Sequence, residues 1–311
     1  MMRNCNWLLL ISIVLLSNVQ AEWQSPYYQD HPLVGEVYSI RDAKMISMDD
    51  LYREIENNQI ILLGETHSNL DHHLQQAEII RHLADSNVSV SVYLEMLPYD
   101  GWDPQSAVGL ELTGLVNLLE NQSKGWDWNA YIPILKASIE KELLLNGANL
   151  TKPQRAQYAH SEECIVSRGE QTLNSCEVLD SDQLALLNQL IYDAHCEYLP
   201  KENTGPLANI QVAKDASFAL SLLTAKDSEK ILLITGKIHA RKDIGVPVHL
   251  QRLGAESISI AFMVVDPERS EVTDYFDQEL GQQFDFAVFT PNDRNQDPCI
   301  EFAEKLKKFK H

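Results

Sequence analysis

Histidines and carboxylates gather beside two glycines in this sequence. The stretch "QIILLGETHSNLDHHLQQ" at 59–76 places Glu65 and His67 directly after a glycine, with two more histidines close behind. A second stretch, "LLITGKIH" at 232–239, again places a histidine, His239, three residues after a glycine. Neutral imidazoles and carboxylates can ligate a divalent metal, line a ligand pocket or move protons. The same side chains could also do no more than hydrogen-bond the loops in which they lie.

The elements around these stretches predict an α/β fold with a mostly parallel sheet. A continuous apolar run, Gln59–Leu63, precedes a helix over about Leu70–Ser86 and a second apolar strand, Val90–Met96. A strand, a crossover helix and a second buried strand form a unit with parallel strands and covered faces. Further strands are expected near Leu143–Ala148 and at 230–236, 257–265 and 284–290. Further helices are expected over about Ala107–Glu120, from about Tyr131, over about Ser181–Leu199 and Pro206–Ala225, after Gly245, and in the lysine-rich C-terminus.

In open α/β sheets, ligands bind in the crevice beyond the carboxyl ends of the strands. Glu65 and His67 follow the first strand, Glu95 is the next-to-last residue of "VYLEM", and His239 follows "LLITG". The two glycines are expected to adopt a positive φ in tight turns that deliver the histidines into the crevice. The sequence therefore predicts that these side chains, supplied by different segments, line one site.

Two helices carry further candidates for this site. His73 and Gln76 fall on the apolar arc of the helix that follows the first strand, in or near its first turn. Gln211 and Asp215 are four residues apart and so share one helical face. Asp215 could orient a histidine, as carboxylates commonly do around metals. Arg241, which follows His239, could meet an anionic ligand group such as a propionate.

The totals favour an exported protein with one domain. The chain has 311 residues, 44% of them hydrophobic, and a net charge of −20, which disfavours nucleic acid and anionic lipid surfaces as partners. Residues 1–21 have an early arginine, a short apolar run and a small-residue end, the layout of a cleaved signal peptide. We expect a mature domain at 22–311, in the periplasm or secreted, with no transmembrane span.

Four cysteines would remain after cleavage of the leader, an even number that favours two disulfides in an exported chain. They allow three pairings, of which Cys164–Cys176 is the most local. The polar segment at about 151–182 contains both of these cysteines. It is predicted to be an insertion stapled by a disulfide.

Several segments together resemble one family, the ChaN-like haem-binding uptake proteins of the Tiki/TraB/erythromycin-esterase superfamily. They are "LLGETHSNLDHHLQQ", "VYLEM", "GWDWNAYIPILKAS", "GANL", "QVAKDASFA", "ITGKIHARKDIGVP" and "FDFAVFTP". The resemblance implies an α/β fold with its site at the strand ends. It singles out Glu65, His67, His73, Glu95, Gln211, Asp215 and His239.

The first functional hypothesis is therefore an exported haem-binding protein that takes part in haem or iron uptake. Its pocket would include His67, His73, Gln76, Tyr131, Gln211, Asp215, His239 and Arg241. A tyrosine or histidine would ligate the iron, and the candidates are His67, His73, His239, Tyr93, Tyr99 and Tyr131. Besides haem, candidate partners are a second copy of the chain or a protein of an uptake system.

Two alternatives stay open. A metal-dependent hydrolase would hold Mn, Co or Zn through Glu65, His67 and His239, with Glu65 or Glu95 as the catalytic general base. A protein that keeps the fold with an idle site would instead present its acidic surface to a protein partner.

Overall fold

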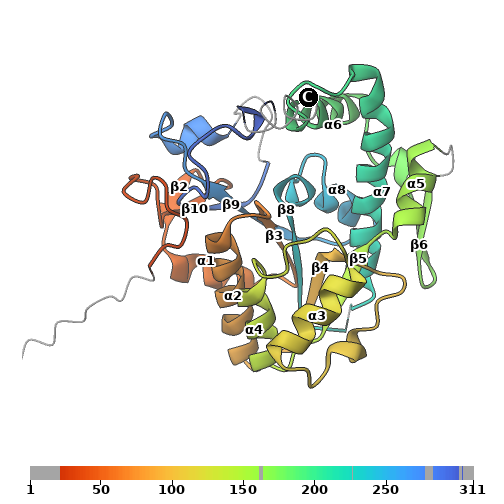
Figure 1. The fold of residues 1–311 in the computed structure, drawn as a ribbon, viewed down its shortest axis with the longest axis horizontal. Helices are drawn as coiled ribbons and strands as arrows, with labels where there is room; N and C mark the ends of the chain where they lie inside the picture. The colour runs from red at the N-terminus through yellow and green to blue at the C-terminus, as the bar shows by residue number, and fades with distance from the viewer. Residues whose placement is uncertain (1–21, 161–163, 226, 277–282, 301–302, 304–311) are drawn as a thin grey trace, which may run out of the picture.

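An eight-stranded sheet organises the chain (Figure 1). The computed structural model describes residues 22–160, 164–225, 227–276, 283–300 and 303. The strand order is β2-β1-β10-β9-β3-β8-β4-β5. The six strands from β10 to β5 run parallel, whereas β1 and β2 are antiparallel additions at one edge. The predicted α/β class with a mostly parallel sheet is confirmed.

The strands of the main sheet have three to nine residues, and the central strand β3 is buried along its whole length. Their bounds are β1 Val37–Ser39, β2 Lys44–Ile46, β3 Ile60–Glu65, β4 Val90–Pro98, β5 Leu145–Asn149, β8 Lys230–Gly236, β9 Ile258–Val264 and β10 Phe286–Thr290. In β3, Ile61 and Leu63 face one side of the sheet and Ile60 and Leu62 the other. This alternation follows from the two-residue repeat of a strand. Both faces of β3 are apolar because both are covered by helices.

Helices cover the two faces in separate groups, which gives three layers (Figure 1). One face carries α1 Met48–Glu56, α2 Leu70–Asp85, α3 Leu112–Gln122 and α4 Ile132–Glu140. The other carries α7 Thr204–Leu223 and α8 Val246–Arg252. The helix α6, Ser181–Ala194, packs on the outer side of α7. Among the described residues, no helix combines the length and the hydropathy that crossing a bilayer requires.

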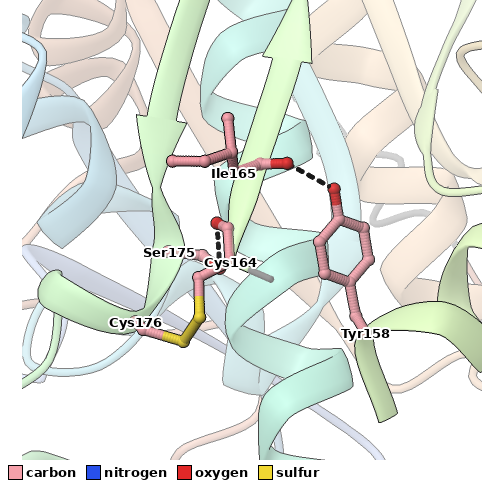
Figure 2. Close-up of a disulfide and its surroundings, with 5 residues drawn as sticks. All are labelled: Tyr158, Cys164, Ile165, Ser175 and Cys176. Carbon is pink, nitrogen blue, oxygen red and sulfur yellow. Dashed lines mark hydrogen bonds between the residues drawn. A yellow bond between two sulfur atoms is a disulfide. The ribbon is translucent and has the colours of Figure 1, made fainter. Parts of the chain in front are cut away.

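The polar insertion contains regular structure that lies against α7. It contributes α5 Lys152–His160, the hairpin of β6 Ile165–Arg168 and β7 Gln171–Asn174, and a short turn of 3₁₀ helix. A disulfide joins Cys164 to Cys176 at the open end of this hairpin (Figure 2). The Tyr158 hydroxyl donates to the Ile165 carbonyl at 2.7 Å, which ties α5 to the hairpin.

The second disulfide joins Cys196, after α6, to Cys299 near the C-terminus. Two disulfides were expected, and the local pair is the one that the sequence favoured. The pairing of Cys196 with Cys299 spans 103 positions of sequence separation. Spacing alone could not have selected it.

The predicted elements match helices and strands of the structure, with bounds that differ by up to about five residues, but α5, β6 and β7 in the polar insertion were not predicted. No element was predicted before Gln59 either, although residues 22–58 contain both edge strands and α1. The β1 and β2 strands have three residues each, too short for a periodic signal, and depend on pairing with β10. The start of α1 is marked by a reciprocal cap between Ser47 and Asp50. The predicted lysine-rich C-terminal helix lies outside the described residues.

Gly147 in β5 allows a close approach between two strands. A Cβ atom at this position would lie 2.0 Å from the Pro98 carbonyl oxygen at the end of β4. We expect Gly147→Ala to force these backbones apart and to lower the free energy of unfolding by about 3 kcal/mol. Urea denaturation measures this change. The matched control is Gly114→Ala in α3, where a Cβ meets nothing closer than 3.8 Å; it should stabilise the protein by about 0.5–1 kcal/mol. Equal effects of both substitutions would contradict the close approach.

Candidate functional site

Glu65 ends β3 as a buried carboxylate surrounded by donors. Its Oε1 atom accepts a hydrogen bond from the Tyr131 hydroxyl at 2.6 Å and lies 2.9 Å from Nδ1 of His67. Its Oε2 atom lies 3.3 Å from Nε2 of His73, in a geometry too poorly aligned to count as a hydrogen bond. The His73 ring also stacks on the Tyr131 ring, with 4.2 Å between the centroids. Strand β3, helix α2 and the loop before α4 thus meet at one carboxylate.

Electrostatics fixes the charge of this cluster. Burial raises the pKa of Glu65, but the contacts with His67 and His73 outweigh it and lower the pKa to about 2. Burial, together with the neighbouring Glu65 carboxylate, raises the pKa of the Tyr131 hydroxyl. Glu65 is therefore an anionic acceptor at neutral pH, and Tyr131 is a donor to it.

Glu95 on β4 forms a second buried centre beside the first. Its Oε1 atom accepts from the Lys214 ammonium at 2.7 Å and lies 3.4 Å from Nε2 of His239. Its Oε2 atom accepts from the Thr235 hydroxyl at 2.7 Å and from the Gly236 backbone N–H at 2.8 Å. Burial raises the pKa of Glu95, but Lys214 and His239 hold it well below its usual range. Both oxygens of this carboxylate are thus engaged within the chain.

Asp215 on α7 contacts the ring nitrogen of His239 that is not near Glu95. Its Oδ1 atom lies 2.5 Å from Nδ1 of His239. Burial and the Lys214 ammonium lower the pKa of His239, but Asp215 and Glu95 outweigh them and raise it to about 9. The predicted orienting partner therefore lies in contact with its histidine, which is protonated at neutral pH.

The two glycines serve close contacts rather than unusual backbone angles. The expectation of a positive φ was wrong: Gly236 has φ −61°, and Gly64 is an ordinary residue of β3 outside the left-handed region. A Cβ on Gly64 would lie 2.8 Å from the Cβ of Ala240. A Cβ on Gly236 would lie 2.9 Å from Nε2 of His67. The absent side chains leave room for the turn after β8 and for the His67 ring.

His67 lies between the two carboxylates. Its Nδ1 is 2.9 Å from Glu65 and its Nε2 is 3.9 Å from Glu95. Its side chain is 39% exposed, compared with 0% for His73 and 6% for His239. The ring meets Trp126 edge-on, with 4.9 Å between the ring centroids. His67 is thus the histidine of this cluster that opens toward solvent.

An open cavity of about 540 Å³ adjoins the cluster, within the size range of small-molecule sites. We call it the Trp126 pocket. Its lining includes Met96, Pro98, Trp126, Asn149, Leu150 and Lys214, with polar and cationic side chains from the end of α3, the loop after it and the start of α5. Lys214 also contacts Glu95, and Trp126 also contacts His67, so the pocket and the buried centres share two walls.

The remaining predicted residues lie around this arrangement in different roles. Gln76 is buried and donates to the Leu63 carbonyl at 3.2 Å. Gln211, one turn before Asp215 on α7, has a buried Oε1 atom without a partner. Arg241 is paired through two nitrogens with Asp243, at 2.9 and 2.6 Å, so its guanidinium is already engaged. The structure therefore brings Glu65, His67, His73, Tyr131, Glu95, Asp215 and His239 together and leaves Arg241 paired elsewhere.

Lys214, which the sequence did not single out, donates to Glu95 and lies beside His239. Its Nζ atom lies 3.1 Å from Nε2 of His239. Gln211, Lys214, Asp215 and Phe218 follow the i, i+3, i+4, i+7 spacing of one helical face. That spacing was the available signal, but a lysine beside an aspartate on a helix is more commonly a solvated pair.

The residues present do not fit the metal ion that the hydrolase alternative requires. Within the described ranges, no cluster of three or more histidine, cysteine, aspartate or glutamate side chains has an arrangement able to hold one. Lys214 explains this physically, because its ammonium lies between Glu95 and His239, where a cation would be ligated. Glu65 lies farther along the sheet edge, bonded to Tyr131 and His67.

The structure thus defines an α/β protein with a cluster of buried acids and histidines at the carboxyl ends of its parallel strands. The family described as "Haem-binding uptake, Tiki superfamily, ChaN" matches residues 51–250, more than half of the sequence, and the chain belongs to that family. The predicted family resemblance is confirmed. None of the curated proteins compared with the chain matches it.

The chain is similar to solved structures. One, described as "Cofacial heme binding to ChaN of Campylobacter jejuni", is 23% identical with a TM-score of 0.64, covering 81% of this chain and 95% of that one. Another, a mutant of the erythromycin esterase EreC in its open conformation, is 13% identical with a TM-score of 0.48, covering 85% and 99%. At 23% identity, the likeness to the ChaN structure shows the fold alone.

Removing the Asp215 carboxylate should lower the pKa of His239. We expect Asp215→Asn to bring this pKa from about 9 toward the ordinary histidine value of about 6.5 or below. A histidine NMR titration measures it, with the resonance assigned by its loss in His239→Gln. The control Asp193→Asn, at an exposed position on α6, should leave the titration unchanged. An unaltered His239 titration in Asp215→Asn would contradict the pairing.

Proposed function

We propose that this chain is an exported haem-binding protein that takes part in haem or iron uptake, and that haem binds in the Trp126 pocket beside His67. The observation that carries the proposal is the pocket itself, in a chain of the haem-binding uptake family. It is an open cavity of about 540 Å³ that adjoins a histidine with an exposed side chain.

One wall of the pocket is apolar and suits a flat, largely apolar ligand. Met96, Pro98, Trp126 and Leu150 give it apolar surface, and aromatic and aliphatic walls are usual in cofactor sites. When bound, haem would supply a ferric iron for an axial side chain to ligate.

His67 is the side chain best placed to ligate that iron. Its Nδ1 faces the Glu65 carboxylate. A carboxylate in this position orients a ligating histidine and makes its other nitrogen a stronger electron-pair donor to the metal. Its Nε2 has no hydrogen-bond partner among the described residues, and the side chain is partly open to solvent.

The competing axial candidates are engaged elsewhere. Tyr131 is buried and donates to Glu65. Tyr93 lies in the core on the α7 side of the sheet, with its hydroxyl 3.0 Å from that of Thr224. The Tyr99 ring is covered by the Arg168 guanidinium, at 4.6 Å from the ring centroid.

Export is supported by the two disulfides, which persist in oxidising compartments. The predicted signal peptide at residues 1–21 lies outside the described residues and remains a prediction. A role in uptake follows as part of the proposal, since an exported binder would collect haem outside the cytoplasm.

A haemin titration tests the binding site. We expect haemin added to the purified chain from residue 22 to give a saturable Soret shift. His67→Ala should weaken it at least about tenfold, because an iron ligand is lost. Absorbance spectroscopy follows both proteins. The control His82→Ala removes a histidine that stacks on Tyr52 far from the pocket and should bind as wild type does. A spectrum that haemin leaves unchanged would reject the proposal, whereas equal binding by His67→Ala would reject only this axial ligand.

A further inference from the structure

Cations line the outer part of the Trp126 pocket, although the chain as a whole is strongly acidic. Lys124 follows α3, while Lys152 and Arg155 belong to the first turn of α5, and all three line the pocket. Within the lining that the structure describes, Asp100 is the carboxylate that faces them. In a chain with a net charge of −20, three cations against one carboxylate reverse the local sign.

These cations are not used to neutralise the protein's own acids. In the described part of the chain, no carboxylate lies within 4.0 Å of Lys124 or Lys152, and both side chains are exposed. Arg155 donates to the Leu150 carbonyl at 2.8 Å and has no carboxylate partner there. Asp100 already has partners of its own, because it accepts a hydrogen bond from Gln154 at 2.8 Å and lies 3.7 Å from Arg168. The positive charge of the rim is thus available to a ligand.

The other cations near the site are paired with carboxylates of the chain, unlike those of the rim. Lys214, at the base of the pocket, is committed to Glu95. Arg241, the cation that the sequence suggested for an anionic group, is paired with Asp243, and its neighbour Lys242 is paired with Asp285. The rim formed by Lys124, Lys152 and Arg155 therefore replaces them as the place for a ligand's negative charge.

We propose that this cationic rim binds the carboxylates of a flat, apolar ligand whose body lies against Trp126 in the same pocket. Applied to haem, which rests on the function proposed above, the rim takes the two propionates while the macrocycle lies on the apolar wall. A carboxylate facing free ammonium groups in a partly closed pocket gains charge-assisted hydrogen bonds without breaking an internal ion pair.

A binding cycle with two porphyrins and two proteins tests this assignment. The proteins are the wild-type chain and Lys124→Ala/Lys152→Ala, which changes two exposed side chains. The ligands are protoporphyrin IX, which has no iron, and its dimethyl ester, whose carboxylates are blocked. Quenching of tryptophan fluorescence measures each Kd. Lys44→Ala/Lys136→Ala is the matched control, because both lysines are exposed, the charge change is the same and neither lines the pocket.

We expect the effects of esterification and of the double substitution on Kd to be non-additive. Esterification and the double substitution should each weaken binding about tenfold, on the scale of one or two partly desolvated ion pairs. Their combination should weaken it no further, because both remove the same interaction. The control pair should bind within about twofold of wild type. Lys124→Arg/Lys152→Arg, which keeps the charge, should restore binding.

Failure of this inference can be separated from failure of the proposed function. Equal affinities of wild type and Lys124→Ala/Lys152→Ala for the diacid would overturn the rim, even where haemin still gives its Soret shift. Carboxylate-dependent porphyrin binding that is unaffected by His67→Ala, for haemin as well, would keep the rim and reject His67 as the iron ligand. No binding of protoporphyrin IX or haemin would overturn both.

Discussion

The burial of the Glu95 carboxylate is the constraint on which the site depends. A carboxylate removed from water must be met by donors and cations, since an unpaired buried charge is strongly destabilising. Glu95 accepts hydrogen bonds from Lys214 on α7 and from the Thr235 hydroxyl and the Gly236 N–H on β8. Helix α7, which packs on one face of the sheet, must therefore place Lys214 at the carboxyl ends of these strands. The same placement brings Asp215 to His239, so the burial of Glu95 also sets the positions of these two side chains.

Gly236 couples the two buried centres. Its N–H donates to Glu95, and its missing side chain leaves space for His67, which Glu65 holds from the other side. A side chain at this position would push the His67 ring out of the gap, so a substitution there acts on both centres. The result is a closed set of acids, imidazoles and one ammonium in which the charges are paired within the chain. The His67 side chain is partly exposed to solvent. For this reason we propose it as the ligand of the iron.

The strand ends could be predicted because buried parallel strands are continuous apolar runs. The run at 230–236 coincides with β8, and the charged or polar residues after each run had to lie at one edge of the sheet. The two glycines marked the turns at the site correctly, but the reason for them is close packing and not a positive φ. A glycine in a sequence does not show which of these two reasons applies. For Lys214 the helical spacing is an ambiguous signal, and the three-residue edge strands β1 and β2 give none. Their roles arise from partners distant in the chain, as does the pairing of Cys196 with Cys299.

Charge is distributed differently in the buried centres and in the Trp126 pocket beside them. In the buried centres, Glu65, Glu95 and Asp215 are matched by histidines and Lys214, so they have little net charge to offer a ligand. At the mouth, the lysines and Arg155 face few acids, while most of the surface is acidic and would repel anions. An anionic ligand is therefore favoured at this opening over the rest of the surface. In the proposed binding mode, the apolar body of the ligand would meet Trp126 and its charge would remain at the rim. The free cations of the rim and the neutralised centres beside the pocket would then orient an amphipathic ligand before any side chain ligates it.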